Sequence, residues 1–233
     1  MILFRSTIIL LVAILSTSCS SSDKIAIIGT GNVGSALGMA FAKQGHEIVY
    51  GSRNPDRKSV HELIARTGQN AKALSIEEAA SAADTIVLAV PWSAARETVE
   101  KLGDVSGKLI IDVTNPAKYD SNGYAVRTVS SSNGELIQGW ASKARVVKAF
   151  NTLSYRTMEN PESANGPVTI PIVGNDKRAK AKVFKLAESI GFESIDLGPI
   201  EYAHELEGML LLWLNARRAT PPAFDFYLRQ ETQ

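Results

Sequence analysis

KIAIIGTGNVG, residues 24–34, holds the strongest structural signal in this chain. The apolar run 24–28 predicts a short buried β-strand, and residues 33–44 predict a helix that Gly45 closes. Between the two, residues 29–34 form the pattern G-x-G-x-x-G. The pattern alone is a weak signal, but after a strand and at the start of a helix it is typical of a dinucleotide-binding unit.

Each glycine of this pattern has its own physical reason. Gly29 permits the tight turn, Gly31 lets the backbone approach a pyrophosphate, and Gly34 lets the helix pack closely on the strand. The N-terminus of the helix would present free N–H groups and a partial positive charge to the phosphates. A glycine-rich turn without a ligand is the alternative interpretation.

Apolar strands and helices alternate along the rest of the chain. This alternation predicts an α/β fold: a Rossmann-type doubly wound, mainly parallel sheet with a short C-terminal helical extension. We expect strands at 24–28, 47–50, 71–74, 85–90, 109–113, 145–150, 170–173 and 193–197. We expect helices at 33–44, 56–67, 76–83, 93–102, 135–142, 176–190 and 200–218. Residues 115–133 are polar and rich in turn formers, and predict an irregular excursion.

The end of the second strand indicates which dinucleotide binds. NAD-binding proteins have Asp or Glu there for the ribose 2′-hydroxyl. This chain has Ser52 and Arg53 instead, and Glu47 lies at the other end of the strand. Ser52 can donate a hydrogen bond to a 2′-phosphate, Arg53 can pair with it, and Arg57 can add a second charge. These residues favour NADP over NAD. The alternative interpretation is that they are solvated surface residues that bind no ligand.

Three more loops follow strands and should lie on the same edge of the sheet: 90–92, 114–116 and 150–152. Asn115 and Asn151 can bind the nicotinamide carboxamide or a second ligand, or equally stabilise a turn. None of the loops supplies an obvious acid, base or nucleophile. Hydride transfer depends on orientation more than on proton chemistry, so the loops argue against an alcohol dehydrogenase, which must also move a proton.

Bulk composition narrows the class of protein. The 233 residues, 45% of them hydrophobic, predict one globular domain with a proper core. A net charge of +1 without a basic stripe argues against a nucleic-acid partner. Cys19 is the single cysteine, so no intrachain disulfide can form, and the scattered histidines indicate no metal site.

Residues 1–22 differ from residues 23–233, which we expect to form the NADP-binding domain with its C-terminal helix. Arg5 precedes an apolar run too short to span a bilayer comfortably, and small residues lead up to Cys19. This pattern predicts an export signal. It resembles a bacterial lipoprotein signal, in which a lipidated Cys19 would hold the domain at a membrane surface on the periplasmic side. The alternatives are an uncleaved anchor with a cytoplasmic domain, or a start codon assigned too far upstream.

The motifs together resemble a known family. They occur in the order 29–34, 51–53, 89–92, 112–116 and 147–152, and extend through 173–176, 191–192, 196–199 and Glu207. The chain resembles the NADP oxidoreductases that use the deazaflavin coenzyme F-420 (F420), and is similar to the cytosolic NADPH domains of membrane ferric reductases. The resemblance covers about residues 24–217, nearly all of the expected domain.

The resemblance implies roles for individual residues. In that family the cofactor lies on the glycine turn and the Ser-Arg pair, which implies contacts from Thr30, Asn32, Val33, Ser52, Arg53 and Arg57. Ala89 and Pro91 would flank the nicotinamide ribose. The deazaflavin would pack over the nicotinamide, near residues 150–152 and the last helix. The family reaction is direct hydride transfer between the nicotinamide C4 and the deazaflavin C5.

Three functions are compatible with these residues. The first is an NADPH-dependent reductase of a deazaflavin or flavin. The second is a reductase of a small imine or carbonyl, although the chain lacks a long additional helical domain. The third is a non-catalytic NADP-binding lipoprotein, which the export signal favours and the loop residues oppose.

The last predicted helix carries one apolar block, Met209 to Leu214. Such a block is apolar almost all round, so one face of the helix can cover the sheet while another meets a partner. We therefore expect a homodimer; the alternative is that both faces are buried within one monomer.

Overall fold

The computed structural model describes residues 22–68, 71–219 and 225–231. Its centre is an eight-stranded sheet with the order β10-β9-β8-β5-β4-β1-β2-β3. These strands are β1 (Lys24–Ile28), β2 (Glu47–Gly51), β3 (Ala71–Leu74), β4 (Thr85–Leu88), β5 (Leu109–Asp112), β8 (Arg145–Lys148), β9 (Thr169–Gly174) and β10 (Glu193–Asp196). The Rossmann-type fold predicted from the sequence is confirmed.

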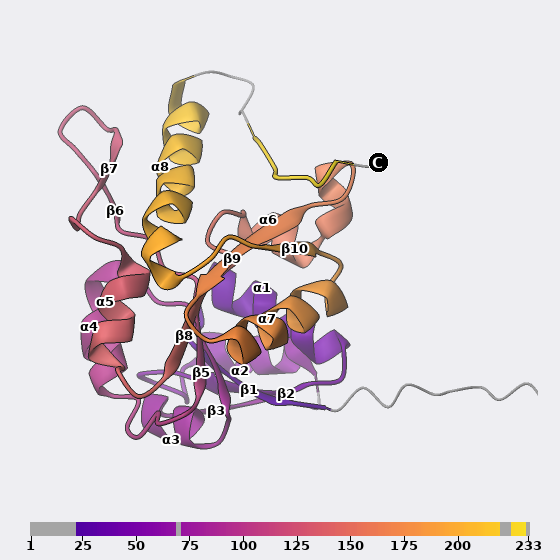
Figure 1. Ribbon diagram of the computed structural model, residues 1–233. Coiled ribbons are helices and arrows are strands. Elements are labelled where there is room, and N and C mark those ends of the chain that lie inside the picture. Colours follow the sequence, from indigo (N-terminus) through magenta and orange to yellow (C-terminus); the bar gives the residue numbers. More distant parts are fainter. Residues whose placement is uncertain (1–21, 69–70, 220–224, 232–233) are drawn as a thin grey trace, which may run out of the picture.

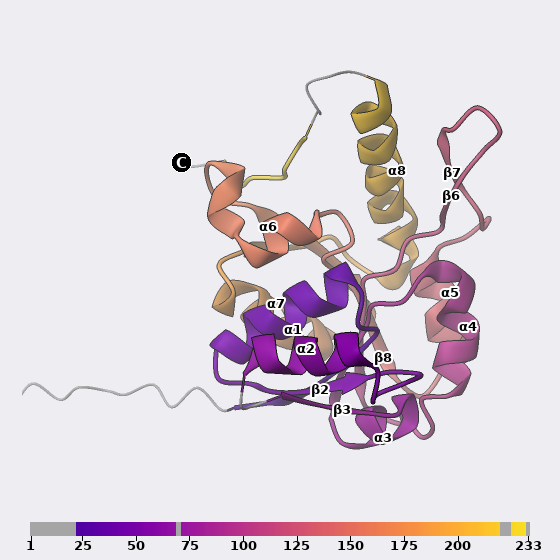
Figure 2. The same cartoon turned by 180° about the vertical axis from the view of Figure 1, so that it is seen from behind.

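Helices cover both faces of this sheet (Figures 1 and 2). They are α1 (Asn32–Lys43), α2 (Lys58–Thr67), α3 (Ile76–Ser81), α4 (Trp92–Glu100), α5 (Asn133–Trp140), α6 (Tyr155–Glu159), α7 (Lys177–Ser189) and α8 (Ala203–Ala219), with short 3-10 helices η1 (Pro161–Ala164) and η2 (Ile200–Tyr202). One apolar cluster joins the sheet to α1, α2, α6 and α7, and a second joins it to α3, α4 and α5. The central strands β1, β4, β5 and β9 are mostly apolar because both of their faces are buried.

The sheet is parallel from β3 to β8 and reverses at β9. Val147 and Lys148 of β8 pair antiparallel with Gly174 and Val173 of β9, and β10 runs parallel to β9. Because an apolar strand looks the same in either direction, the sequence does not show where a mainly parallel sheet reverses.

Two expectations about the loops were incomplete. The excursion 115–133 contains an antiparallel ribbon of β6 (Ala117–Tyr119) and β7 (Ala125–Arg127), and its last residue is the first of α5. Helix α6 and η1 occupy part of 152–168, where no helix was expected. Segments of three to five residues are too short to show a strand or helix period, so sequence patterning does not detect them.

Helix α8 rises from the carboxyl edge of the sheet beside the β6–β7 ribbon (Figure 1). It begins at Ala203, and the start expected at residue 200 belongs to η2 instead. Residues 225–231, called the C-terminal tail below, return to β9 and η1: Thr169 N–H donates to the Leu228 carbonyl at 2.8 Å, and Arg229 donates to the Ala164 carbonyl at 2.7 Å.

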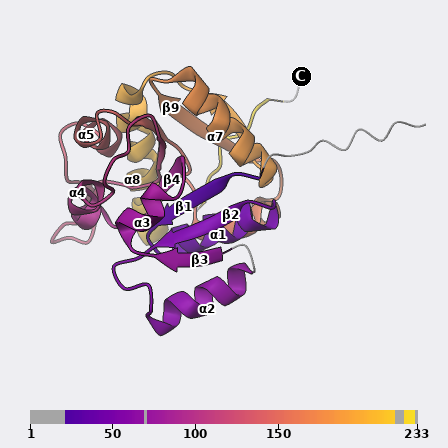
Figure 3. The ribbon, with the colours of Figure 1, turned by 90° about the horizontal axis from the view of Figure 1, so that it is seen from below.

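Within the described parts of the chain, no helix has both the length and the apolar character needed to cross a membrane. The predicted signal segment and Cys19 lie outside the described residues. Residue 22 joins β1 at the amino edge of the sheet, at the end of the strand opposite the glycine turn (Figure 3).

Candidate functional site

Two glycines of the 29–34 motif are required by packing. Gly29 has φ of +112°, and a Cβ there would lie 2.2 Å from the Ala89 carbonyl oxygen. A Cβ on Gly34 would lie 2.0 Å from the Gly29 carbonyl oxygen. Both contacts are with backbone atoms, so a side chain at either position would displace the turn from β1 or from β4.

Gly31 differs from these two, because a Cβ there would meet nothing within 4 Å. The residue is the N-cap of α1 and provides no side-chain cap. The first N–H groups of a helix have no intrahelical acceptor, and together with the helix dipole they favour an anion. Protein packing therefore does not explain the glycine, and the position is open to a ligand at the N-terminus of α1.

A cavity of about 580 Å³ opens beside this turn, at the carboxyl ends of β1, β2 and β4. Eight of the residues predicted to contact the cofactor line it: Gly29, Thr30, Gly31, Ser52, Arg53, Arg57, Ala89 and Pro91. Asn32, Val33 and Gly34 form the first turn of α1 behind the lining. Asn115 and Asn151 do not line this cavity. They follow β5 and β8, at the C-terminal ends of the neighbouring strands.

The arginines predicted to bind a 2′-phosphate, Arg53 and Arg57, lie at the entrance of this cavity and make it positively charged. Arg53 and Arg57 are exposed, and neither has an ion-pair partner among the residues that the structure describes. Arg57 donates to the Thr30 hydroxyl at 3.3 Å, which joins it to the glycine turn. Arg57 is the N-cap of α2, which begins at Lys58 and not at residue 56 as expected.

Glu47 cannot contact a ribose in this cavity. It lies at the amino end of β2, where Lys24 and Lys72 each approach its carboxylate at 3.3 Å. The two residues that directly follow β2 are therefore Ser52 and Arg53, a hydroxyl and a guanidinium group, as the sequence indicates.

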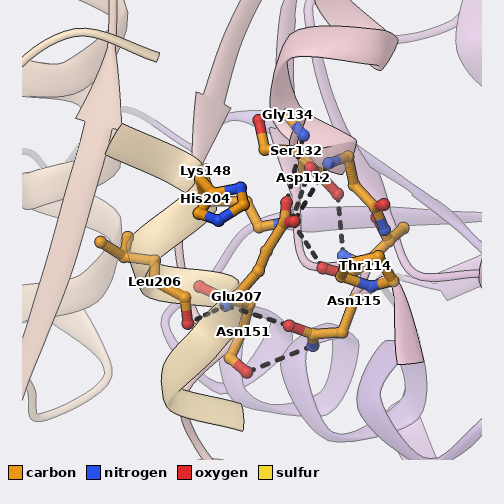
Figure 4. A network of polar contacts seen from close by, with 12 residues as sticks. Asp112, Thr114, Asn115, Ser132, Gly134, Lys148, Asn151, His204, Leu206 and Glu207 are labelled. Carbon is orange, nitrogen blue, oxygen red and sulfur yellow. Dashed lines mark hydrogen bonds and ion pairs between the residues drawn. The ribbon is translucent and has the colours of Figure 1, made fainter. Parts of the chain in front are cut away.

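The two predicted rim amides contact each other directly. Asn151 donates from Nδ2 to Asn115 Oδ1 at 3.1 Å and to the Leu206 carbonyl of α8 at 3.0 Å (Figure 4). Asn115 donates in return to the Asn151 carbonyl at 3.3 Å. Asn151 is 3% exposed, and its side-chain oxygen has no hydrogen-bond partner within the described residues. A buried amide oxygen without a partner is unfavourable unless a ligand or water donates to it.

Behind these amides lies a buried ionic cluster that the sequence analysis did not identify as such. Lys148, on β8, contacts Asp112 of β5 at 2.8 Å and Glu207 of α8 at 2.9 Å, and all three side chains are fully buried (Figure 4). Arg127 of β7 approaches Glu207 at 3.2 Å. Two cations and two carboxylates therefore meet with no net charge.

The hydrogen bonds of the cluster are saturated. Glu207 accepts from the backbone N–H groups of Asn133 and Gly134 at 3.1 and 3.2 Å, besides its two cations. Lys148 also donates to the Thr114 carbonyl at 2.5 Å, and Asp112 accepts from the Thr114 N–H at 2.8 Å. Burial raises the pKa of Glu207, whereas the Lys148 ammonium acts in the opposite direction. The cluster thus holds α8, the ribbon and the Thr114–Asn115 segment together at the sheet edge.

A sequence signal for this cluster exists in part. The apolar strands LIID and RVVK each end in a charged residue, Asp112 and Lys148, and a charge at the end of a fully buried strand needs a partner. Nothing local pairs them with Glu207 or Arg127, which lie on distant segments of the chain.

The fold, the turn geometry and the positive cavity mouth define a Rossmann-type dinucleotide-binding domain. The family model described as NADP oxidoreductase, coenzyme F420-dependent, matches residues 24–116. The chain is 33% identical over 211 residues to the F420-dependent NADP reductase of Methanothermobacter thermautotrophicus, covering 83% of this chain and 90% of that protein. The chain belongs to this family of NADP oxidoreductases.

Two further comparisons agree with this assignment. A crystal structure from an Arthrobacter species, assigned as an F420-dependent NADP reductase, matches with a TM-score of 0.82 and 29% identity, covering 90% of this chain and all of that one. The metalloreductase STEAP3 of Rattus norvegicus is 29% identical over 193 residues, which cover 82% of this chain but 37% of that protein.

Proposed function

We propose that this chain binds NADP(H) in the cavity at 29–34 and transfers hydride between the nicotinamide and a deazaflavin or flavin. The observation that carries the proposal is the open space at Gly31 together with two exposed arginines that follow β2, Arg53 and Arg57, neither of which has an ion pair among the described residues. These features fit the pyrophosphate and the 2′-phosphate of one ligand. The names of the relatives supply the class of acceptor.

Reduced NADP supplies the hydride, which carries both electrons to the acceptor ring, while the proton that completes the reduced ring comes from water. The residues of the chain bind and orient the two rings. The N-terminus of α1 holds the pyrophosphate, and Ser52, Arg53 and Arg57 hold the 2′-phosphate. We assign the carboxamide or a ring N–H group to the side-chain oxygen of Asn151, which is buried and has no hydrogen-bond partner within the described residues.

The ionic cluster supports orientation rather than proton transfer. All polar atoms of Lys148, Asp112 and Glu207 already have partners, so none of them is poised to exchange a proton with a substrate. Such a site agrees with an acceptor that takes its hydride from NADPH and its proton from water.

Spectral titration tests the proposal. The purified chain is mixed with NADPH and, separately, with oxidised F420, FMN, FAD, and a small cyclic imine or ketone. We expect bleaching of a deazaflavin or flavin with equimolar NADPH oxidation. Turnover of the imine or carbonyl alone would support the alternative reductase, and NADPH binding without any turnover would support a non-catalytic NADP-binding protein.

We also propose that residues 1–18 are removed and that Cys19 is lipidated, which would tether the domain to a membrane on the periplasmic side. The support is the charged start, the apolar run and the small residues before Cys19. Several acyl chains would anchor the domain stably, whereas one anchors weakly. Mass spectrometry of the membrane-extracted protein decides this: an intact Met1 or an unmodified Cys19 would refute it and favour the cytoplasmic alternative.

A homodimer is the third part of the proposal. The apolar block on α8 is only partly covered in the monomer, and Leu212 is 67% exposed. A second copy would bury this surface, which is the usual reason for an exposed apolar face. Light scattering at micromolar concentration should give twice the monomer mass, and a monomeric mass would refute the dimer.

A further inference from the structure

A second hollow, of about 430 Å³, lies between α6, α8 and the C-terminal tail. Figure 1 shows these three segments grouped above the carboxyl edge of the sheet. Its lining includes Tyr155, Arg156, Trp213, Arg217, Asp225 and Tyr227. Five of its nine lining residues are aromatic or arginine, and three others carry hydroxyl groups.

The C-terminal tail builds one wall of the hollow through specific contacts. Trp213 donates from its indole nitrogen to Asp225 at 2.6 Å, and the Tyr227 hydroxyl donates to the same carboxylate at 3.1 Å. Tyr227 also contacts the Thr157 hydroxyl of α6 at 3.3 Å. The tail is thereby held on α8 and α6 at the same time.

The charges in the hollow are unbalanced. Arg217 lies over the Trp213 ring at 4.7 Å, and its nearest carboxylate, Asp225, is 3.7 Å away and already accepts from Trp213 and Tyr227. Arg156 has no ion pair among the described residues and lies 5.8 Å from the centre of the Tyr155 ring. One carboxylate therefore faces two guanidinium groups, an arrangement that favours a phosphate or carboxylate ligand.

Helix α8 connects the hollow to the proposed hydride-transfer site. Asn151 contacts Leu206 on α8, and Trp213 lies seven residues farther along the same helix. At 1.5 Å per residue this is about 10 Å. Tyr155 begins α6 four residues after Asn151. An acceptor whose ring lies at the rim beside Asn115, with a side chain of several bonds, would span this distance to the hollow.

We propose that this hollow binds the anionic, phosphate-bearing side chain of the hydride acceptor, with Arg156 and Arg217 as the groups that recognise it. This inference rests on the proposed reduction of a deazaflavin or flavin. It makes the acceptor a phosphorylated ring compound rather than a neutral one, and it gives the C-terminal tail a role in substrate selection.

Matched acceptors test this inference by binding, without NADPH. The dissociation constants of FMN and riboflavin, and of F420 and its core without the phosphate-bearing side chain, are measured by fluorescence titration of the full chain. We expect FMN and F420 to bind more tightly than their neutral counterparts. Losing one charge-assisted contact in Arg217→Met or Arg156→Met should weaken binding of the phosphorylated ligands about tenfold and leave the neutral ligands unchanged.

Arg218→Met is the matched control, because Arg218 lies next to Arg217 but contacts Tyr124 and the Asn122 carbonyl on the ribbon. Equal affinity for phosphorylated and neutral ligands, or equal losses in all three variants, would overturn the inference. Reduction of both ligand types at similar rates would then still support the proposed function. Failure of any flavin or deazaflavin to be reduced, with phosphate-dependent binding intact, would overturn the proposed reaction and leave the binding site standing.

Discussion

Arg53 is the residue on which cofactor choice depends most directly. It is exposed at the mouth of the cavity, beside Ser52, and has no ion pair among the described residues. A hydrogen bond to a charged group contributes about 1.5–3 kcal/mol, so Arg53→Ala should weaken NADPH binding roughly ten- to a hundredfold. NADH has no 2′-phosphate, and its affinity should change little.

Isothermal titration with both cofactors measures this effect. Lys58→Ala is a suitable control, since Lys58 is exposed on the adjoining helix and pairs with Glu62. An equal loss of NADPH and NADH affinity in Arg53→Ala would contradict the assignment of the 2′-phosphate site.

Alanine substitutions of Gly31 and Gly34 should affect different properties, cofactor binding in the first case and stability in the second. Gly34→Ala places a methyl group on the Gly29 carbonyl oxygen, and overpacking of this kind costs about 1–3 kcal/mol or more. Gly31→Ala meets no protein atom, so it should lose NADPH affinity while its stability falls only by the small cost of alanine at the N-cap of α1. Urea unfolding and NADPH titration on both variants separate the effects. A stable Gly31→Ala that binds NADPH normally would show that no phosphate approaches this position.

Tyr50 provides a pH-dependent test of the core. Burial raises the pKa of Tyr50 to about 12, although the Thr67 hydroxyl acts in the opposite direction. The folded state holds the phenol proton more tightly than the unfolded state. The protonated phenol therefore adds its full contribution to the free energy of unfolding below about pH 10, and this contribution is lost as the pH rises towards 12. Two pKa units correspond to roughly 2–3 kcal/mol.

Urea unfolding at pH 9 and at pH 11.5 measures this contribution. The difference in unfolding free energy between the wild type and Tyr50→Phe should shrink or change sign in favour of the variant at the higher pH. A difference that stays constant with pH would show that the phenol titrates normally.

At the scale of elements, the position of α8 depends on Glu207. The carboxylate receives two backbone N–H groups, Lys148 and Arg127 while fully buried. Glu207→Gln leaves the cluster with an uncompensated positive charge, and breaking a buried ion pair in this way costs about 3–5 kcal/mol. We expect a large drop in the free energy of unfolding, measured by urea titration.

Glu205→Gln is the control, because Glu205 is exposed on the same helix. Folded Glu207→Gln should still bind NADPH through the glycine turn, because that turn lies beside β1, β2 and β4 and not beside α8. Similar stability of the two variants would mean that the cluster does not hold α8.

At the scale of the whole molecule, the proposed cofactor cavity and the start of the described chain lie at opposite ends of the parallel strands. The cavity is at the carboxyl ends of β1, β2 and β4, whereas Asp23 precedes the amino end of β1. A tether at Cys19 would therefore attach to the edge away from the cavity. We expect the lipidated protein in vesicles and a Cys19→Ala form in solution to bind NADPH with the same affinity, by fluorescence titration. Weaker binding to the tethered form would show that the membrane covers the cavity.

The sequence by itself determined the features that depend on neighbouring residues. The strand, the glycine turn and the start of α1 lie within residues 24–34, and steric limits on Gly29 and Gly34 act over that short range. Ser52 and Arg53 could be placed because the carboxyl end of a parallel strand is always the ligand edge. The alternation of buried strands and helices indicated the sheet for the same local reason.

Tertiary structure alone decided the features that join distant segments. Asp112 and Lys148 are 36 residues apart, and Glu207 comes from a helix near the other end of the chain, so their pairing has no local pattern. The reversal at β9 has no local pattern either, since a buried apolar strand has the same composition in either direction. One wall of the hollow depends on the contact between Asp225 of the C-terminal tail and Trp213 of α8. Ion pairs within the buried cluster and contacts that line the hollow form between residues that only the fold brings together, so the spacing of residues along the chain does not predict them.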